Sequence, residues 1–382
     1  VFSSTQDYLH QEVRENYFQC DVSYCGHQSL SAKYSQESEH QVQDVLPALF
    51  TAKNPVFFWG GTGAAKSTTM HLFVDEKRKV DPNFGLIDLR ASQLDPVDVR
   101  GMPYVNIEKQ ESSWLPFDVF PNEERDGKFG LLLLEELNSA IPAVLASLYE
   151  LLFDRRIGKY KLPDGWAVWA LGNRDQDNGV TYQVPGPVAN RFANHILVNP
   201  TVDDFCNHGF KVGCRLEVMA FLRWRPELMM NYDPKNPELT FGSMRTWTYV
   251  SDLMKSWESQ GKSFKDDLFL SLIQNCVGDG AGVEFIGFLD YFKKLPDLDD
   301  LIKDPENAPI YDVKDAHLNW AIICGLFNKA DGKNAGQVIK YAMRLPAEFS
   351  VVLMRDCTRE IPEFTECPEY VEWASMHSRT IL

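Results

Sequence analysis

The sequence predicts an α/β fold in which a core with a five-stranded parallel sheet is followed by helical regions. Five short apolar runs recur in the first half of the chain, at 55–60, 85–89, 130–136, 166–173 and 195–200. The runs are continuously apolar rather than alternating, which is typical of strands buried on both faces of a parallel sheet. Helical patterns separate the runs, so strands and helices alternate as they do in α/β domains.

Helical spacing supports the rest of this assignment. Residues 139–154 place apolar side chains at i, i+3, i+4 and i+7, which predicts an amphipathic helix. After residue 200 the strand signals fade. Three segments are typical of helices: 215–224, 244–257 and 266–278. A stretch rich in Pro and Asp, 293–312, predicts a connector, and 335–357 predicts a last helical segment.

The composition is that of an ordinary globular protein, with 44% apolar and 24% charged residues among 382. No apolar run approaches the roughly 18 residues that a membrane span needs. The first residues lack the layout of a secretion signal. The eight cysteines include no CxxC pair, which argues against a structural zinc site or a redox motif. We therefore expect a cytoplasmic protein with reduced cysteines and no membrane span.

A near-match to a phosphate-binding loop follows the first apolar run. The stretch GGTGAAKST (60–68) fits Gly, four residues, then Gly-Lys-Ser/Thr, except that Ala65 replaces the second glycine. A strand precedes it and a helix follows, the context in which backbone N–H groups cradle phosphates. Ala65 is a mild departure if its φ is negative and a costly one if the loop requires a positive φ. The candidate nucleotide-binding residues are Gly60, Gly61, Thr62, Gly63, Ala64, Ala65, Lys66, Ser67 and Thr68.

Two adjacent carboxylates end the third apolar run, in LLLLEELN. Downstream of a phosphate loop, carboxylates at the end of a buried strand are typical of a magnesium and water site. Glu135 and the Ser67 hydroxyl would hold Mg²⁺, and Glu136 would polarise the attacking water. Lys66 would reach the β and γ phosphates of ATP. Because Asp is more usual at the metal position, Glu135 is a second departure. ATP and Mg²⁺ are the expected cofactors.

Taken together, these motifs resemble those of the MoxR-type branch of the AAA+ ATPases over essentially the whole chain. LLLLEELNSAIPAVLASLYELL is similar to the family's Walker B strand and following helix, and ALGNRDQDNGVTYQVPGPVANRF to its sensor-1 and arginine-finger stretch. DLRASQLDPVDVRGMP is similar to the segment with the helix-2 insert, and FGSMRTWTYVSDL occupies the place of sensor 2. The resemblance implies a P-loop AAA+ αβα core with a five-stranded parallel sheet, an all-helical lid domain and a C-terminal helical region.

By this resemblance, four residues carry catalysis. Glu136 activates water, and Asn173 becomes sensor 1, which orients that water near the γ-phosphate. Arg245 becomes sensor 2, which reaches the phosphates from the lid. Arg191 becomes the arginine finger, which acts on the nucleotide of a neighbouring subunit, and Arg174 ranks behind it as an alternative basic group. A planar guanidinium with fixed donors suits charge that spreads over phosphate oxygens.

The resemblance also implies a domain organisation. A nucleotide-binding domain would span 1–200, with an insert at 90–128 and a hairpin before sensor 1 at 154–168. A helical lid domain carrying sensor 2 would span 201–300, and a C-terminal helical extension 301–382. In the hairpin, Tyr160 and its basic neighbours either contact a threaded or docked partner or form an ordinary solvated hairpin.

Three functions remain open on the sequence. The leading hypothesis is an ATPase that forms a ring, a hexamer by resemblance, and remodels a partner protein, for which a von Willebrand factor A domain protein is one candidate. The alternative is a nucleotide-controlled switch with little hydrolysis, which Ala65 and Glu135 suggest. A nucleic-acid motor related to restriction translocases is less favoured, because the net charge is −16 and counterion release needs clustered Lys and Arg.

Overall fold

The computed structural model describes residues 35–381, except 38, 109, 116, 175–181, 234 and 236–238. The elements described all belong to one unit, Ser35–Leu382. Within these described residues, no helix has the length and apolar character that crossing a membrane requires.

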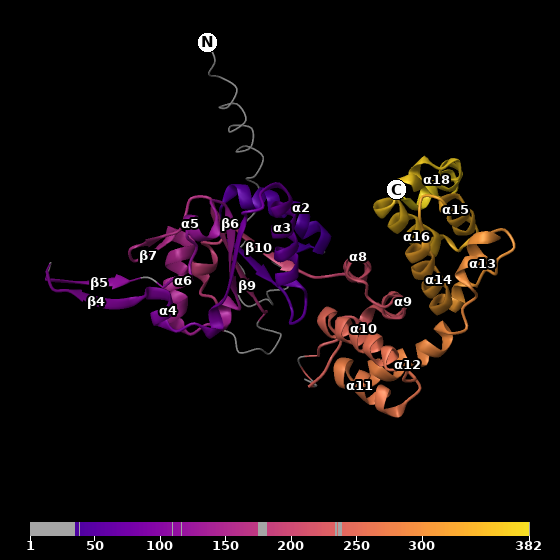
Figure 1. Ribbon diagram of the computed structural model, residues 1–382, viewed down its shortest axis with the longest axis horizontal. Coiled ribbons are helices and arrows are strands. Elements are labelled where there is room, and N and C mark those ends of the chain that lie inside the picture. The colour runs from indigo at the N-terminus through magenta and orange to yellow at the C-terminus, as the bar shows by residue number, and fades with distance from the viewer. Residues whose placement is uncertain are drawn as a thin grey trace, which may run out of the picture. The chain divides into compact units, whose positions relative to one another are not determined.

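The centre of the fold is a parallel sheet, which confirms the predicted α/β class (Figure 1). Its strands in spatial order are β1 (Ser35–Glu37), β10 (Asn194–Val198), β2 (Val56–Trp59), β9 (Trp166–Gly172), β6 (Gly130–Glu135) and β3 (Gly85–Arg90). All neighbouring pairs are parallel, so the carboxyl ends of the strands meet at one edge. The five apolar runs form the five expected strands, and β1 adds a sixth at the edge, which its polar sequence Ser-Gln-Glu did not predict.

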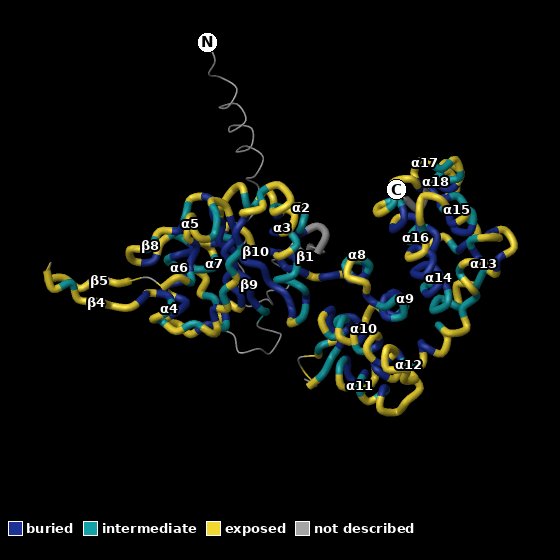
Figure 2. Tube along the Cα trace, in the orientation of Figure 1, coloured by how far each residue is buried: buried dark blue, intermediate teal, exposed yellow. Residues whose placement is uncertain are grey.

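Helices pack on both faces of this sheet and give it three layers (Figure 1, Figure 2). On one face, α2 (Glu39–Ala52) and α3 (Lys66–Val80) join the strands in a shared core that includes Met70 and Phe58. Because side chains alternate along a strand, Phe57 points to the opposite face. There it contacts Phe192, which in turn contacts Phe153 of α6.

Helix α6 (Pro142–Asp154) begins with a proline in its first turn, where the missing N–H costs nothing. It buries Val144, Leu145, Leu148 and Leu151, the apolar stripe that predicted it. Short elements connect the core: η2 (Ala91–Gln93), α4 (Pro96–Arg100), α5 (Glu123–Asp126), η3 (Leu137–Ser139) and α7 (Gly186–Ala189). Two antiparallel hairpins lie in the expected insert and before sensor 1: β4 (Met102–Asn106) with β5 (Glu111–Leu115), and β7 (Arg156–Ile157) with β8 (Tyr160–Lys161).

The remainder of the chain is helical, as predicted. Its elements are α8 (Val202–Val212), α9 (Leu216–Trp224), η5 (Pro226–Leu228), α10 (Met244–Ser259), α11 (Asp267–Val277), α12 (Asp279–Phe292), α13 (Leu298–Lys303), η6 (Val313–Asp315), α14 (Ala316–Lys329), α15 (Ala335–Arg344), α16 (Ala347–Glu360), α17 (Glu363–Glu366) and α18 (Pro368–Ile381). The expected connector contains α13, which Asp297 caps. The last predicted segment is interrupted at Pro346, which separates α15 from α16.

Two hydrophobic clusters stabilise the helical part. One centres on Phe221, Trp247 and Phe285 of α9, α10 and α12. The other gathers α13 to α18 around side chains such as Tyr341 and Phe349. Helix α14 contributes residues to both clusters. Because α14 belongs to both clusters, they do not test the domain limits drawn from the sequence. Those limits, including the boundary at residue 300, stay predictions.

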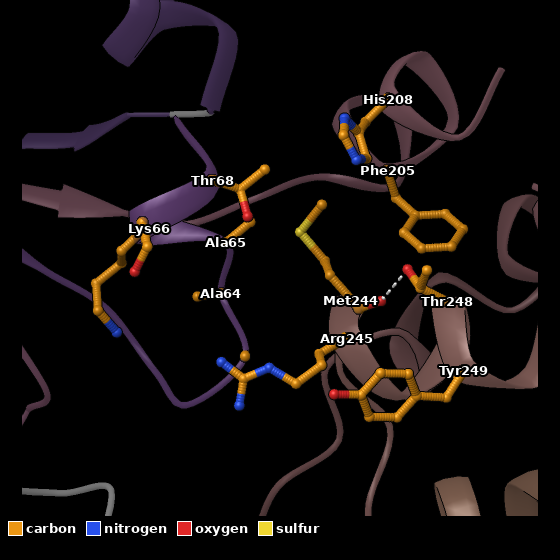
Figure 3. A pocket seen from close by; sticks show the side chains of 12 residues that line it. Ala64, Ala65, Lys66, Thr68, Phe205, His208, Met244, Arg245, Thr248 and Tyr249 are labelled. Atoms are coloured by element: carbon orange, nitrogen blue, oxygen red, sulfur yellow. Dashed lines mark hydrogen bonds between the residues drawn. The ribbon is translucent and has the colours of Figure 1, made fainter. Parts of the chain in front are cut away.

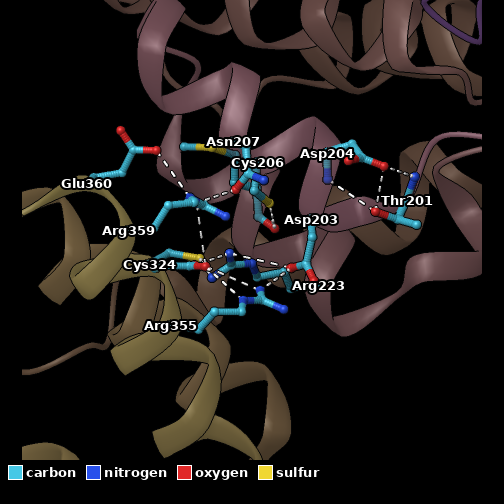
Figure 4. Close-up of polar contacts among 12 residues, drawn as sticks. Thr201, Asp203, Asp204, Cys206, Asn207, Arg223, Cys324, Arg355, Arg359 and Glu360 are labelled. Carbon is cyan, nitrogen blue, oxygen red and sulfur yellow. Dashed lines mark hydrogen bonds and ion pairs between the residues drawn. The ribbon is translucent and has the colours of Figure 1, made fainter. Parts of the chain in front are cut away.

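A buried ion pair joins α9 to α16 (Figure 4). The Arg223 guanidinium donates to the Asp356 carboxylate, and neither side chain is more than 2% exposed. Two charges can leave water at this depth only because each neutralises the other, since an unpaired buried charge costs several kcal/mol.

Helix α8 adds its own polar groups to this cluster (Figure 4). Asp203 lies 2.8 Å from Arg355 Nη2, and Asn207 Oδ1 accepts from Arg359 Nη2 at 2.5 Å. Burial alone would raise the pKa of Asp203, but the hydrogen bond from Arg355 and the nearby arginine charges outweigh it and lower that pKa. The cluster therefore ties α8 to α16 through charge-assisted contacts.

Candidate functional site

The phosphate-type loop lies between β2 and α3, as expected. Its backbone resolves the question about Ala65, which has φ 54° and ψ 20° and caps the N-terminus of α3. Ala65 therefore occupies the left-handed region that favours glycine, and the substitution is the costly one of the two alternatives. The N-terminus of the 15-residue helix that follows adjoins the loop, the usual arrangement for an anion site.

Gly63 shows why this loop needs a glycine at its fourth position. Its φ is +76°, and a Cβ built there would lie 2.7 Å from the Ser243 Oγ. Ser243 caps α10, directly before the segment that carries Arg245. The loop and the start of α10 therefore touch at a point where no side chain fits.

Lys66 is held against the end of the neighbouring strand. Its Nζ donates to the carbonyl oxygens of Gly60 and Gly61, at 2.8 and 3.0 Å, and to Asn173 Oδ1 at 3.0 Å. Asn173 directly follows β9, which pairs with β2. Its own carbonyl accepts from the buried Asn138 Nδ2 at 2.8 Å. The loop lysine and Asn173, the predicted sensor 1, are far apart in sequence but in direct contact.

The two carboxylates at the end of β6 lie in different surroundings. Glu135 is 8% exposed, its Oε2 lies 3.8 Å from Arg90 Nε, and its Oε1 has no hydrogen-bond partner among the described residues. Glu136 is exposed, has φ 51°, and accepts a hydrogen bond of 2.6 Å from the Ser92 hydroxyl. Ser92 was missed from the sequence, because only the pairing of β3 with β6 brings it to Glu136.

A pocket of about 270 Å³ lies between the loop and two helices, α8 and α10 (Figure 3). Its lining residues are Gly63, Ala64, Ala65, Lys66, Ser67, Thr68, Phe205, His208, Met244, Arg245, Thr248 and Tyr249. Figure 3 shows the Arg245 guanidinium pointing toward the loop. The structure therefore brings Arg245 to the phosphate loop, where the sequence placed sensor 2. Gly60 and Gly61 lie at the start of the loop, and Thr62 is exposed at its turn.

Phe205 and His208 are pocket residues that sequence reasoning missed. Both lie on α8, one helical turn apart, and the helix begins three residues after the last strand of the core with Thr201 as its cap. Burial, and secondarily the charge of Lys211, lowers the pKa of His208, which favours the neutral imidazole. The i, i+3 spacing directly after the final strand was the signal that could have found them.

Arg191 lies apart from this pocket. It is exposed, and its guanidinium lies 5.4 Å from the centre of the Phe153 ring. It forms no ion pair with any other described residue. Arg191 follows α7 in the turn before β10. Residues 175–181, between Asn173 and this turn, lie outside the described residues.

The hairpin before sensor 1 is anchored to the core rather than open to solvent throughout. Tyr160 stacks on Phe120 with ring centres 5.2 Å apart, and its hydroxyl donates to the Pro121 carbonyl at 2.8 Å. Burial raises the pKa of this hydroxyl. Arg155 donates to the carbonyls of Pro163 and Trp166. Both side chains therefore fasten the hairpin, and the exposed basic groups there are Arg156, Lys159 and Lys161.

Comparisons with known proteins show similarity at the level of solved structures. No protein-family model matches the sequence, and no curated protein matches it. NtrX from Brucella abortus in complex with ADP is 13% identical with a TM-score of 0.39, and the match covers 92% of this chain and 71% of that chain. A point mutant of RuvB from Thermotoga maritima is 13% identical with a TM-score of 0.35, covering 73% and 83%. At these values the matches carry no argument for function, which rests on the geometry of the site.

Proposed function

We propose that this protein binds and hydrolyses ATP as an AAA+ ATPase of MoxR type. The observation that carries the proposal is the contact between Lys66 and Asn173 at the carboxyl edge of the sheet. On the next strand of that edge, β6 ends in Glu135, which Glu136 directly follows. A cation for phosphate, a polar group for water and two carboxylates thus meet at neighbouring strand ends, the set that phosphoryl transfer requires.

Each group has a distinct part in this proposal. The N–H groups at the start of α3 bind phosphate oxygens, for which Lys66 exchanges its present contacts with Gly60 and Gly61. Glu136 accepts a proton from the attacking water, which Asn173 orients. Arg245 reaches the phosphates from α10 and stabilises the charge that spreads over them.

The residues at the metal position fit Mg²⁺. Glu135 has a buried carboxylate oxygen without a hydrogen-bond partner among the described residues, an arrangement that a cation would satisfy. Ser67 lies at the start of α3 and lines the pocket, where its hydroxyl would be the second protein ligand. When bound, Mg²⁺ neutralises charge on the β and γ phosphate oxygens.

The proposed role of Arg191 requires that several subunits assemble for catalysis. It is exposed and absent from the pocket lining, so its proposed role as an arginine finger requires the nucleotide of a second subunit. A ring, a hexamer by family resemblance, supplies such a neighbour. The same resemblance supports a cytoplasmic remodelling role on a partner protein, with a von Willebrand factor A domain protein as candidate.

One observation favours a second candidate, a nucleotide-controlled switch with little hydrolysis. The left-handed Ala65 strains the loop that holds the phosphates, and Glu135 replaces the usual aspartate at the metal position. A switch would bind ATP as tightly as a motor but release phosphate no faster than a catalytically disabled variant. The net charge of −16 remains an argument against a nucleic-acid motor.

Phosphate release decides between these candidates. The rate is measured with ATP and Mg²⁺ over a range of protein concentrations, with Glu136→Gln as the matched control because it changes one atom type and removes the base. A motor releases phosphate faster than the control, with a rate per subunit that rises as rings assemble. Equal rates for both proteins, with ATP binding retained, would refute the hydrolysis proposal and leave the switch.

A separate experiment tests for the proposed partner protein. The Glu136→Gln variant with ATP should hold the assembled ring and its partner together during affinity capture. If the captured ring carries no stable partner under these conditions, the remodelling role is contradicted, whereas the proposal of nucleotide binding is not.

A further inference from the structure

We infer that His195 is a positioning residue that fixes the turn carrying Arg191 to the strand leading into the phosphate loop. The inference rests on the proposed role of Arg191 as a finger for a neighbouring subunit. His195 lies in β10, beside Phe57 in the register of β10 with β2. It is half-buried and does not line the nucleotide pocket.

Both ring nitrogens of His195 make hydrogen bonds whose direction is determined by their partners. The Trp59 indole N–H can only donate, and it reaches His195 Nδ1 at 3.0 Å. The carbonyl oxygen of Ala189 can only accept, and it lies 2.8 Å from Nε2. Nε2 therefore carries the proton that it donates to the Ala189 carbonyl, and Nδ1 accepts from the indole, because a proton on Nδ1 would face the indole N–H.

These two partners lie at the two places that the proposed function needs to connect. Trp59 is the last residue of β2 and directly precedes Gly60 of the phosphate loop. Ala189 is the last residue of α7, two positions before Arg191. One side chain therefore spans the distance from the phosphate loop of this subunit to the finger that it presents to the next.

The turn that carries Arg191 has a second attachment beside the same strand. We therefore assign to His195 the orientation of the turn, whereas the second attachment keeps the turn in place. The N–H of Ala193 donates to the Pro55 carbonyl at 2.9 Å, directly before β2 begins. The Ala189 carbonyl that accepts from His195 also accepts from the N–H of Phe192 at 3.2 Å. With the Pro55 contact at one end and the Trp59 contact at the other, the turn can tilt only if the histidine bond breaks.

Aromatic rings pack around this connection. Trp59 stacks on Phe57 with ring centres 3.9 Å apart, and Phe57 meets Phe192 edge to face at 5.1 Å. Phe192 also packs against Phe153, over whose ring the Arg191 guanidinium lies. The hydrogen bonds of His195 are therefore partly buried among these rings, and the same rings connect them to the side chain of Arg191.

Two substitutions separate the hydrogen bonds from the ring. His195→Phe keeps an aromatic ring of similar shape but neither hydrogen bond. His195→Gln loses the ring but offers an acceptor oxygen and a donor nitrogen about as far apart as the two ring nitrogens, so it can serve Trp59 and Ala189 again. Rescue by Gln, but not by Phe, is the behaviour expected of a positioning role through hydrogen bonds.

Mixed assemblies show on which side of the subunit boundary His195 acts. Subunits with Arg191→Ala keep a catalytic site but lack a finger, and subunits with Glu136→Gln keep the finger but lack the base. Mixing them should restore phosphate release, because each mixed boundary can combine one intact site with one intact finger. His195→Phe is then placed on one type of subunit or on the other.

We expect His195→Phe to lower phosphate release of the mixture about tenfold or more when it is on the finger-donating subunit, since small misplacements of catalytic groups are costly. On the site-donating subunit it should change release less than about twofold, and KM for ATP should be unchanged in both. His195→Gln on the finger donor should restore most of the rate. Each variant is checked for ATP binding and for assembly before mixing.

Other outcomes overturn the inference in different ways. Equal loss from both placements, or loss only on the site donor, shows that His195 supports the phosphate loop or the fold rather than the finger. No loss on the finger donor shows that the turn needs no such bond. If the Arg191→Ala and Glu136→Gln proteins assemble and bind ATP but their mixture stays inactive, the finger role itself is wrong, and the inference that rests on it falls with it.

Discussion

Replacing Ala65 with glycine tests the backbone of the phosphate loop. Ala65 has φ 54°, a conformation that costs an L-residue other than glycine about 1–2 kcal/mol. Ala65→Gly removes that strain and one methyl group that is half-buried against the helical cluster. The change therefore has a favourable and an unfavourable part, whose sizes follow from the structure.

The balance is a modest gain in the free energy of unfolding. Relief of about 1.5 kcal/mol is opposed by about 0.4 kcal/mol for a half-buried methyl. Greater freedom of glycine in the unfolded chain opposes it by a further ~0.7 kcal/mol. The expected gain is about 0.5 kcal/mol. Ala64 is the matched control, because it is 2% exposed and does not have a positive φ. Ala64→Gly should lose about 1.5 kcal/mol, from a full methyl and the same freedom.

The measurement is chemical denaturation of both variants beside the parent protein. The difference between the two Ala→Gly changes should be about 2 kcal/mol, which exceeds the uncertainty of either value. Phosphate release should stay of the same order in Ala65→Gly, because the strain belongs to the loop and not to a contact with the reacting groups. A strong rise in release would instead identify the alanine as a brake. If Ala65→Gly destabilises the protein as much as Ala64→Gly, the left-handed backbone at Ala65 is wrong.

Three further predictions concern other parts of the molecule. Glu136→Gln should reduce phosphate release to background while a nucleotide titration still shows binding; release at the parent rate would remove Glu136 from catalysis. Gly63→Ala should weaken nucleotide binding, because its Cβ would lie 2.7 Å from the Ser243 Oγ at a positive φ. Adding Ser243→Gly should recover part of the affinity for nucleotide. If no affinity is recovered, the backbone of the loop, and not the contact with Ser243, causes the loss. Arg223→Met should lower the free energy of unfolding by about 1.5–3 kcal/mol, because it removes the buried charge-assisted hydrogen bond of Asp356 and leaves that carboxylate only Arg355 and Arg359. Adding Asp356→Leu should restore part of the loss; additive losses in denaturation would contradict this.

The parts of the fold with strong local patterns could be predicted. Buried parallel strands need apolar residues at every position, so the runs at 55–60 and 130–136 marked β2 and β6 directly. Strand β1 is short and polar and forms only because β10 offers it a free edge, which no local pattern records. Helix α13 lies in a stretch whose prolines and aspartates suggested a connector, yet Asp297 serves as its cap.

The candidate site divides in the same way. Lys66, Glu136 and Asn173 could be named because each lies in a recognisable motif: Lys66 begins the helix after the loop, and Glu136 and Asn173 directly follow strands. Ser92 and His195 could not, because Glu136 lies 44 positions from Ser92 and Trp59 lies 136 positions from His195, and only sheet pairing brings them together. The sign of φ at Ala65 could not be predicted either, because both signs are compatible with the sequence pattern and only the folded loop determines it.

Helix α8 has one further consequence for how the protein can move. Phe205 and His208 form part of the pocket wall, while Asp203 and Asn207 on the same 11-residue helix are bonded to arginines of α16. Turning the helix about its own axis to fit a nucleotide would pull those charged contacts apart. The movement that keeps them is a translation or swing in which α8 carries α16 with it. A change in the pocket would then be transmitted through α8 to the last helices of the chain as a rigid-body movement.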